Sequence, residues 1–486
     1  MSVKRNTLIN TAGAIAPIAV SLVTVPLYLH RIGDARYGVL AIVWLLVAYF
    51  GVFDLGLSRA TANQIAKLQN ASASERERVF WNALALNAFF GLVGGIVLYA
   101  VAGLLFATLF KVPVLIKPEL APTLPWIALA IPVATISGVL TGTLEGRSRF
   151  ATVNAIQVGG TILSQLVPLS VALLRGPSLT WLVPSAVLAR LVSSVPLAWV
   201  TARAVPISRP QWPSRGTIRT LLGYGAWVAV TNLINPILDF ADRLVIGATI
   251  GAKSVTYYTI PYSLATRVNI LPGALSRTLF PVLSYKSDLD GLRLATQAVR
   301  GLAAILTPIV IFGIVLMRPF LTIWVGADAA NRSFGVGEIM LAGTWLSSLS
   351  FIPFAQLQGQ SHPEVVARFH LLEAIPFLAL LWVGLHIFGI AGAAGAWSVR
   401  ISADAVLLFF AAGYGFRLVR SLAPAFSLIV AACAVAIIFP FPSILGWAAG
   451  GLLFALSLFW AFSFDSPARA QFADLWRSVR QVVGRR

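Results

Sequence analysis

Stretches of about twenty apolar residues recur along the whole chain and are separated by short polar connections. A transmembrane helix needs about 20 such residues to cross the hydrocarbon core of a bilayer. Fourteen stretches meet this requirement, and the alternating pattern typical of membrane barrels does not appear. They run over 7–29, 38–58, 80–110, 124–143, 152–174, 179–201, 220–246, 254–276, 301–325, 336–357, 366–388, 390–413, 422–440 and 444–463. The sequence therefore predicts an all-α polytopic membrane protein with about 14 transmembrane helices.

The composition excludes a soluble domain and several kinds of site. Hydrophobic residues make up 58% of the chain and charged residues 11%, against about 25% charged in soluble domains. One cysteine, Cys433, and four histidines argue against a disulfide framework and a Cys/His metal site, so no metal or cofactor is predicted. A phosphate-binding loop of the GxxxxGK[ST] type is also absent, which excludes ATP hydrolysis through such a loop.

The net charge of +19 comes from Lys and Arg in short connections and tails. Attraction to anionic membrane lipids explains this placement better than nucleic acid binding does. If the N-terminus lies inside, the cytoplasmic segments hold 24 Lys and Arg and the outer connections hold 9. The positive-inside rule then predicts that both termini are cytoplasmic.

Short sequence matches reveal an internal repeat. Leu-Ser-Arg at 57–59 returns at 275–277, and the segment around Arg190 resembles the segment around Arg400. The offset drifts only from 218 to 210 residues, as small loop deletions would produce. The repeat shifts the chain by six spans and so preserves topology, which is typical of parallel repeats in transporters.

The repeat predicts the division of the chain. An N-terminal six-helix lobe is expected over 1–210 and a C-terminal six-helix lobe over 211–416. Two extra transmembrane helices follow over 417–464, and a basic cytoplasmic tail occupies 465–486.

Several motifs carry a resemblance to a known family. They are "RIGDARYGVLAI", "DLGLSRA", "LEGRSRF", "LQGQSHP" and "FGIAGAAGAW". This pattern resembles the Wzx-type oligosaccharide flippases, the polysaccharide transporter branch of the multidrug/oligosaccharidyl-lipid/polysaccharide exporter superfamily. The similarity extends over about residues 4 to 415, although fourteen apparent spans exceed the twelve common in that superfamily.

The resemblance implies a MATE-like, V-shaped fold of two lobes that works by alternating access and catalyses no reaction. It implies that undecaprenyl-pyrophosphate-linked oligosaccharide repeat units move from the cytoplasmic to the outer leaflet of the bacterial inner membrane. A polysaccharide polymerase and its co-polymerase are the partners expected for such a transporter, besides membrane lipids.

A transporter of a diphosphate-linked sugar needs cations for the phosphates and polar groups for the sugar. Arg267 lies near the middle of a predicted span, with no acid three or four residues away. Arg59 and Arg277 occupy matching span ends, and Asp54 lies about 7 Å deeper along the helix. Asn235 lies within another predicted span. These five residues are the predicted substrate contacts.

A second group of charges could couple transport to H⁺ or Na⁺. Asp239 and Arg243 lie one helical turn apart, with Asp242 between them. An internal salt bridge is the alternative for this pair. Glu373 is expected deep in another span, where an ionisable side chain is a functional candidate.

Three further charges inside spans are expected to fix helix packing. They are Arg190, Arg400 and Asp404, of which the last two lie one turn apart.

Other functions stay open from the sequence alone. A cation-coupled exporter of small molecules is one, but its cavity should prefer acids to arginines. A membrane-embedded polysaccharide polymerase or polyprenyl-sugar transferase is another, but it would need a sizeable catalytic loop. An inactive scaffold is the third.

Overall fold

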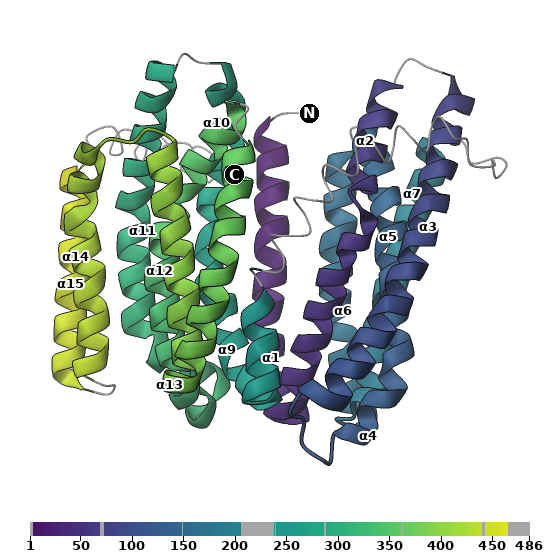
Figure 1. The fold of residues 1–486 in the computed structure, drawn as a ribbon, viewed down its shortest axis with the longest axis horizontal. Helices are drawn as coiled ribbons and strands as arrows, with labels where there is room; N and C mark the ends of the chain where they lie inside the picture. Colours follow the sequence, from purple (N-terminus) through teal and green to yellow (C-terminus); the bar gives the residue numbers. More distant parts are fainter. Residues whose placement is uncertain are drawn as a thin grey trace, which may run out of the picture. The chain divides into compact units, whose positions relative to one another are not determined.

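The computed structural model describes most of the chain, and within that part every regular element is helical (Figure 1). The described residues are 3–68, 72–147, 149–205, 238, 240–285, 288–360, 363–439 and 443–464. The chain divides into two compact units, Met1–Thr256 and Tyr257–Arg486. The predicted lobe boundary after residue 210 lies outside the described residues and stays a prediction.

The first unit holds the elements from α1 to the start of α9. They are α1 (Val3–Phe50), η1 (Gly51–Asp54), α2 (Leu57–Lys67), α3 (Ala73–Leu104), η2 (Leu105–Leu109), α4 (Lys117–Leu120), η3 (Ala121–Thr123), α5 (Leu124–Gly146), α6 (Phe150–Arg175) and α7 (Leu179–Ala204). The division after Thr256 falls within α9 (Ala252–Ala265). The second unit holds the rest. They are η4 (Thr266–Asn269), α10 (Ile270–Tyr285), α11 (Asp288–Val325), α12 (Ala327–Gly359), α13 (Pro363–Ala411), α14 (Phe416–Ile438) and α15 (Ile444–Phe464).

Nine helices of the described part are long and apolar enough to cross a membrane, which confirms a polytopic helical protein. The exact count of 14 stays a prediction. Two very long helices, α1 and α13, each contain a glycine with positive φ, Gly33 (φ 77°) and Gly389 (φ 59°). Residues with a Cβ rarely adopt this conformation, so glycine allows the chain to reverse there. Each of these helices therefore holds two of the predicted spans.

The structure differs from the predicted continuous span over 38–58. Helix α1 ends at Phe50, and one 3₁₀ turn leads to Leu55 (φ 47°) and Gly56 (φ 69°). Two consecutive residues with left-handed backbone cannot continue a right-handed helix. Helix α2 therefore starts anew at Leu57.

Small residues let helices of the first unit approach closely. A Cβ on Gly138 would overlap the Ser58 hydroxyl, and a Cβ on Gly142 would overlap the Ser58 carbonyl. Glycines four residues apart favour this kind of contact between membrane helices. The same region contains the apolar core. Its buried members are Leu57, Ala60, Phe80, Ala83, Val139, Leu140, Leu144, Val153 and Leu197.

In the second unit, α12 packs against both α11 and α13. The last two helices, α14 and α15, pack against each other and against α11, as Figure 1 shows at the end of the colour scale. One contact in this group joins the rings of Phe312 and Phe454, whose centroids are 5.4 Å apart.

Candidate functional site

A polar pocket lies among α5, α6 and α7 of the first unit, and α2 also reaches it through Ser58. Its volume is about 480 Å³. Ten of its sixteen lining residues are polar, and seven of these carry a hydroxyl. The lining consists of Ser58, Ala134, Ser137, Gly138, Thr141, Gly142, Glu145, Ile156, Gln157, Gly160, Thr161, Ser164, Arg190, Ser193, Ser194 and Leu197. Such a lining is costly in a membrane protein unless water or a polar ligand fills the pocket.

The hydroxyls of the pocket are held in place by their own helices. Ser164 donates to the carbonyl of Thr161 at 2.8 Å, and Thr161 donates to the carbonyl of Gln157 at 2.8 Å. Ser193 donates to the carbonyl of Arg190 at 2.7 Å. Each hydroxyl has one proton to donate. These oxygens therefore keep lone pairs for accepting hydrogen bonds.

Arg190 brings a positive charge to this pocket from the middle of α7. No acid of the described residues forms a salt bridge with it. Its repeat counterpart, Arg400, is placed differently, because it is buried and its guanidinium carbon lies 5.2 Å from the centre of the Phe377 ring. The structural role predicted for both arginines stays a prediction.

Asp54, the last residue of η1, binds the first turn of helix α2. Its carboxylate accepts hydrogen bonds from the Ser58 backbone N–H at 3.2 and 3.3 Å and from the Ser58 hydroxyl at 2.5 Å. A side chain that satisfies an N–H group of the first helical turn stabilises the start of the helix. Since Ser58 also lines the polar pocket, Asp54 positions one of its walls. Its predicted substrate contact stays a prediction.

For four other predicted residues, the side chain or the whole residue lies outside the described part of the structure. Arg59 lies in the first turn of α2 and Arg277 lies in α10, but their side chains are outside the described part. Asn235 and Asp239 lie outside the described residues altogether. The roles predicted for these four residues stay predictions.

Arg267 lies in η4, the 3₁₀ turn that separates α9 from α10. Its side chain is exposed, and it forms no ion pair with the residues that the structure describes. The same turn is tied to α12, because Ser348 donates to the Asn269 side chain at 2.8 Å. The sequence predicted one continuous span over 254–276, but the structure interrupts this span at η4. A 3₁₀ stretch inside a helix often marks a hinge.

The predicted coupling residues that the structure describes are buried. Asp242 and Arg243 are both buried, and the Arg243 backbone N–H donates to the Asp242 carboxylate at 2.7 Å. Glu373 is buried on α13 beside Asp404, whose carboxylate lies 3.7 Å from the His370 ring nitrogen Nε2. The kink in α13 thus brings charges of two predicted spans together.

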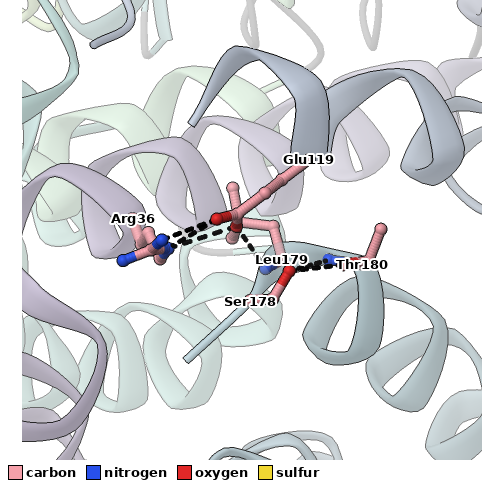
Figure 2. A network of polar contacts seen from close by, with 5 residues as sticks. All are labelled: Arg36, Glu119, Ser178, Leu179 and Thr180. Carbon is pink, nitrogen blue, oxygen red and sulfur yellow. Dashed lines mark hydrogen bonds and ion pairs between the residues drawn. The ribbon is translucent and has the colours of Figure 1, made fainter. Parts of the chain in front are cut away.

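A further polar network joins three connections of the first unit (Figure 2). Nε of Arg36 lies 3.1 Å from both carboxylate oxygens of Glu119, and Nη2 lies 2.6 Å from one of them. The second oxygen of Glu119 accepts the backbone N–H of Leu179 at 2.8 Å. Ser178 caps the same helix start by accepting the Thr180 N–H at 3.4 Å. The sequence did not identify this network as a unit.

Electrostatics stabilise the charged form of Glu119, which lies in α4, before the apolar α5. Burial alone would raise the pKa of Glu119. The hydrogen bonds from Arg36 and Leu179, together with the Arg36 charge, outweigh burial and hold this pKa below its usual range. Glu119 therefore stays ionised and keeps the three connections joined at neutral pH.

Solved structures of transporters share this fold. A lipid II flippase MurJ in an inward closed conformation superposes with a TM-score of 0.70 and 13% identity, covering 93% of this chain and 98% of that chain. An inward-facing multidrug resistance MATE family transporter of the MOP superfamily gives a TM-score of 0.66 and 16% identity, covering 84% and 98%. These similarities confirm the predicted MATE-like fold.

The sequence comparisons agree with the fold. A curated protein of Shigella flexneri, described as "Putative O-antigen transporter", is 26% identical over 409 residues, covering 84% of this chain and 97% of that protein. The family described as "Polysaccharide biosynthesis protein" matches residues 32–328, which is more than half of the chain. The chain therefore belongs to this polysaccharide biosynthesis protein family.

Proposed function

We propose that the protein moves oligosaccharide repeat units linked to undecaprenyl pyrophosphate from the cytoplasmic to the outer leaflet by alternating access. This step serves the synthesis of a cell-surface polysaccharide or exopolysaccharide. Family membership, the curated relative and the flippase fold support it. The same findings do not favour a small-molecule exporter or a membrane-embedded enzyme.

The exposed position of Arg267 is the observation that carries the proposal. A guanidinium at the centre of a bilayer costs about 2.5–3.5 kcal/mol by insertion scales, so it faces water or a polar partner. Arg267 is exposed and forms no ion pair with any described residue. A diphosphate would offer it two oxygens at once, which is the geometry that Arg binds best. Arg59 and Arg277, at the repeated Leu-Ser-Arg motifs, are further contacts in this proposal.

Coupling to H⁺ or Na⁺ is part of the proposal and centres on Glu373. This buried acid lies beside Asp404, and Asp404 lies near His370. Two neighbouring carboxylates are costly when both are ionised, so a proton or cation that reduces their repulsion is favoured. Uptake and release of that ion would bias the packing of the two halves of α13.

The membrane location and partners follow from the same function. The excess of Lys and Arg on one side supports an inner-membrane protein with both termini in the cytoplasm. A polysaccharide polymerase and its co-polymerase would receive the translocated repeat units. Such partners would act at the outer leaflet.

Reconstitution tests the proposed function directly. Proteoliposomes would contain the purified protein and the lipid-linked oligosaccharide that accumulates in a deletion strain. We expect the wild type to expose this lipid to a membrane-impermeant glycosidase or oxidant. We expect Arg267→Ala to slow exposure at least tenfold, since it removes the charge proposed to bind phosphate, about 1.5–3 kcal/mol.

Arg420→Ala is the matched control, because Arg420 is also an exposed arginine of the same unit but lies in α14, away from η4. It should translocate at the wild-type rate. Wild-type protein that exposes no lipid would contradict the function itself. An Arg267→Ala variant with normal amount and normal rate would contradict the role of Arg267 alone.

A further inference from the structure

The polar pocket among α5, α6 and α7 differs in lining from a second pocket in the described part of its unit. That second pocket lies between α3 and α5, has a volume of about 360 Å³ and is lined almost entirely by apolar side chains such as Leu92, Ile96 and Leu129. A lipid chain would fit such a surface without cost. The polar pocket instead offers hydroxyls, the Gln157 amide, the Glu145 carboxylate and the Arg190 guanidinium.

The hydrogen-bonding groups of the polar pocket fall into two kinds. Ser164, Thr161 and Ser193 give their protons to backbone carbonyls, so they present acceptors to the pocket. The Glu145 carboxylate is a further acceptor of the lining, suited to sugar hydroxyls rather than to a phosphate. Arg190 has only donors and a permanent charge. A ligand that complements both kinds has several hydroxyl donors and an anionic group close to them. A sugar phosphate has this combination.

Size and asymmetry also point to a ligand. About 480 Å³ lies within the roughly 300–1,000 Å³ range of small-molecule sites. Arg400, the repeat counterpart of Arg190, is buried against Phe377, with the acids Glu373 and Asp404 nearby. An arginine needed only for helix packing would be expected to have the same surroundings in both halves. Instead, Arg190 opens onto hydroxyls.

We propose that this pocket is a sugar-phosphate subsite, in which Arg190 binds a phosphate and the surrounding hydroxyls bind the adjoining sugar. The inference rests on the proposed function, since the sugar phosphate would belong to the carrier-linked oligosaccharide. It assigns Arg190 a binding role in place of the structural role predicted from the sequence. Asp54 contributes indirectly by holding the Ser58 wall.

Filling the pocket tests whether the ligand enters it. Ser164→Trp places a large ring in the pocket, and we expect at least a tenfold slower translocation in the proteoliposome assay. Ser170→Trp is the matched control, because Ser170 is an exposed serine of the same helix that also donates to its own backbone, at 3.0 Å, but does not line the pocket. It should translocate at the wild-type rate.

Removing the charge tests the phosphate contact through binding alone. The probe is the lipid-linked oligosaccharide from the deletion strain, titrated onto purified protein in detergent. Arg190→Gln should bind it roughly tenfold to a hundredfold more weakly, as expected when charge-assisted hydrogen bonds are lost. Arg190→Lys should recover part of the affinity, since it restores the charge without the bidentate geometry.

Arg203→Gln is the control for charge on the same helix, because Arg203 stacks on Trp199 at 3.7 Å near the end of α7. It should bind as the wild type does. If the wild type binds and translocates while Ser164→Trp and Arg190→Gln match it, the pocket inference is overturned and the proposed function stands. If the wild type neither binds nor translocates the lipid, the proposed function fails first. The binding assay decides even if Ser164→Trp does not fold.

Discussion

Replacing Glu119 by Gln should loosen the junction of three connections in the first unit. The carboxylate accepts two Arg36 nitrogens, with distances of 2.6 to 3.1 Å, and the Leu179 N–H at 2.8 Å. Breaking a fully buried ion pair costs about 3–5 kcal/mol. The Arg36 and Glu119 side chains are 26% and 14% exposed, so solvent screens part of this interaction. We therefore expect a loss of about 2 kcal/mol, within the range for hydrogen bonds to charged groups.

Hydrogen exchange of the start of α7 measures this loss locally. The Leu179 amide donates to Glu119 itself, so its exchange reports the opening of the junction. A loss of about 2 kcal/mol corresponds to roughly thirtyfold faster exchange, since 1.4 kcal/mol is tenfold. The measurement is mass spectrometry of the peptide that contains Leu179, in detergent at neutral pH.

Asp328→Asn provides the comparison, because Asp328 and Arg332 form an ion pair whose side chains are 69% and 56% exposed. Exposed pairs of this kind contribute little, so exchange around α12 should hardly change. Unaltered exchange at Leu179 in Glu119→Gln would refute the reasoning. The reasoning would also be refuted if Asp328→Asn accelerated exchange around α12 as much as Glu119→Gln accelerates exchange at Leu179.

Two more predictions concern the pH dependence of stability and a close contact of Gly392. The pKa of Glu119 is lower in the folded state than in the unfolded state. The contribution of Glu119 to folding stability is therefore complete above the ordinary Glu pKa of about 4.3 and is lost as the pH falls through the lower, folded-state pKa. The difference in apparent Tm between wild type and Glu119→Gln should thus be constant from about pH 7 to 5 and shrink below about pH 4. A difference in Tm that grows as the pH falls would contradict the lowered pKa of Glu119. Gly392→Ala should destabilise the hairpin of α13, because its Cβ would overlap the Gly384 carbonyl, whereas Gly395→Ala, with nothing within 4 Å, should be tolerated. Equal yields of folded protein for the two alanine variants, measured by size-exclusion chromatography, would contradict the overlap.

The sequence predicted the helical membrane fold because its main signal is local. Each apolar stretch reports its own ability to span a bilayer, whatever its neighbours are. The chain reversals at Gly33 and Gly389 lie between predicted spans, so the span boundaries located them as well. The break after Phe50 was missed, since the apolar pattern continues through it while Leu55 and Gly56 change the backbone direction.

The candidate sites were harder to predict because their residues are far apart in sequence. Arg36 belongs to a conspicuous motif, but Glu119 is 83 residues further on, and no spacing rule joins them. Arg190 was placed among structural charges because its helix contains no acid or ligand motif nearby. Only the fold shows that serines and threonines of α5 and α6 surround it.

The break after Phe50 also has a consequence for biosynthesis. The helical stretch from the Gly33 reversal to Phe50 holds about 17 residues, or about 25 Å, less than the roughly 30 Å of hydrocarbon. A segment this short is a poor independent signal for membrane insertion. The first part of α1 and this short second part should therefore enter the bilayer together as a hairpin, and a glycosylation site placed in the Gly33 turn would report whether they do.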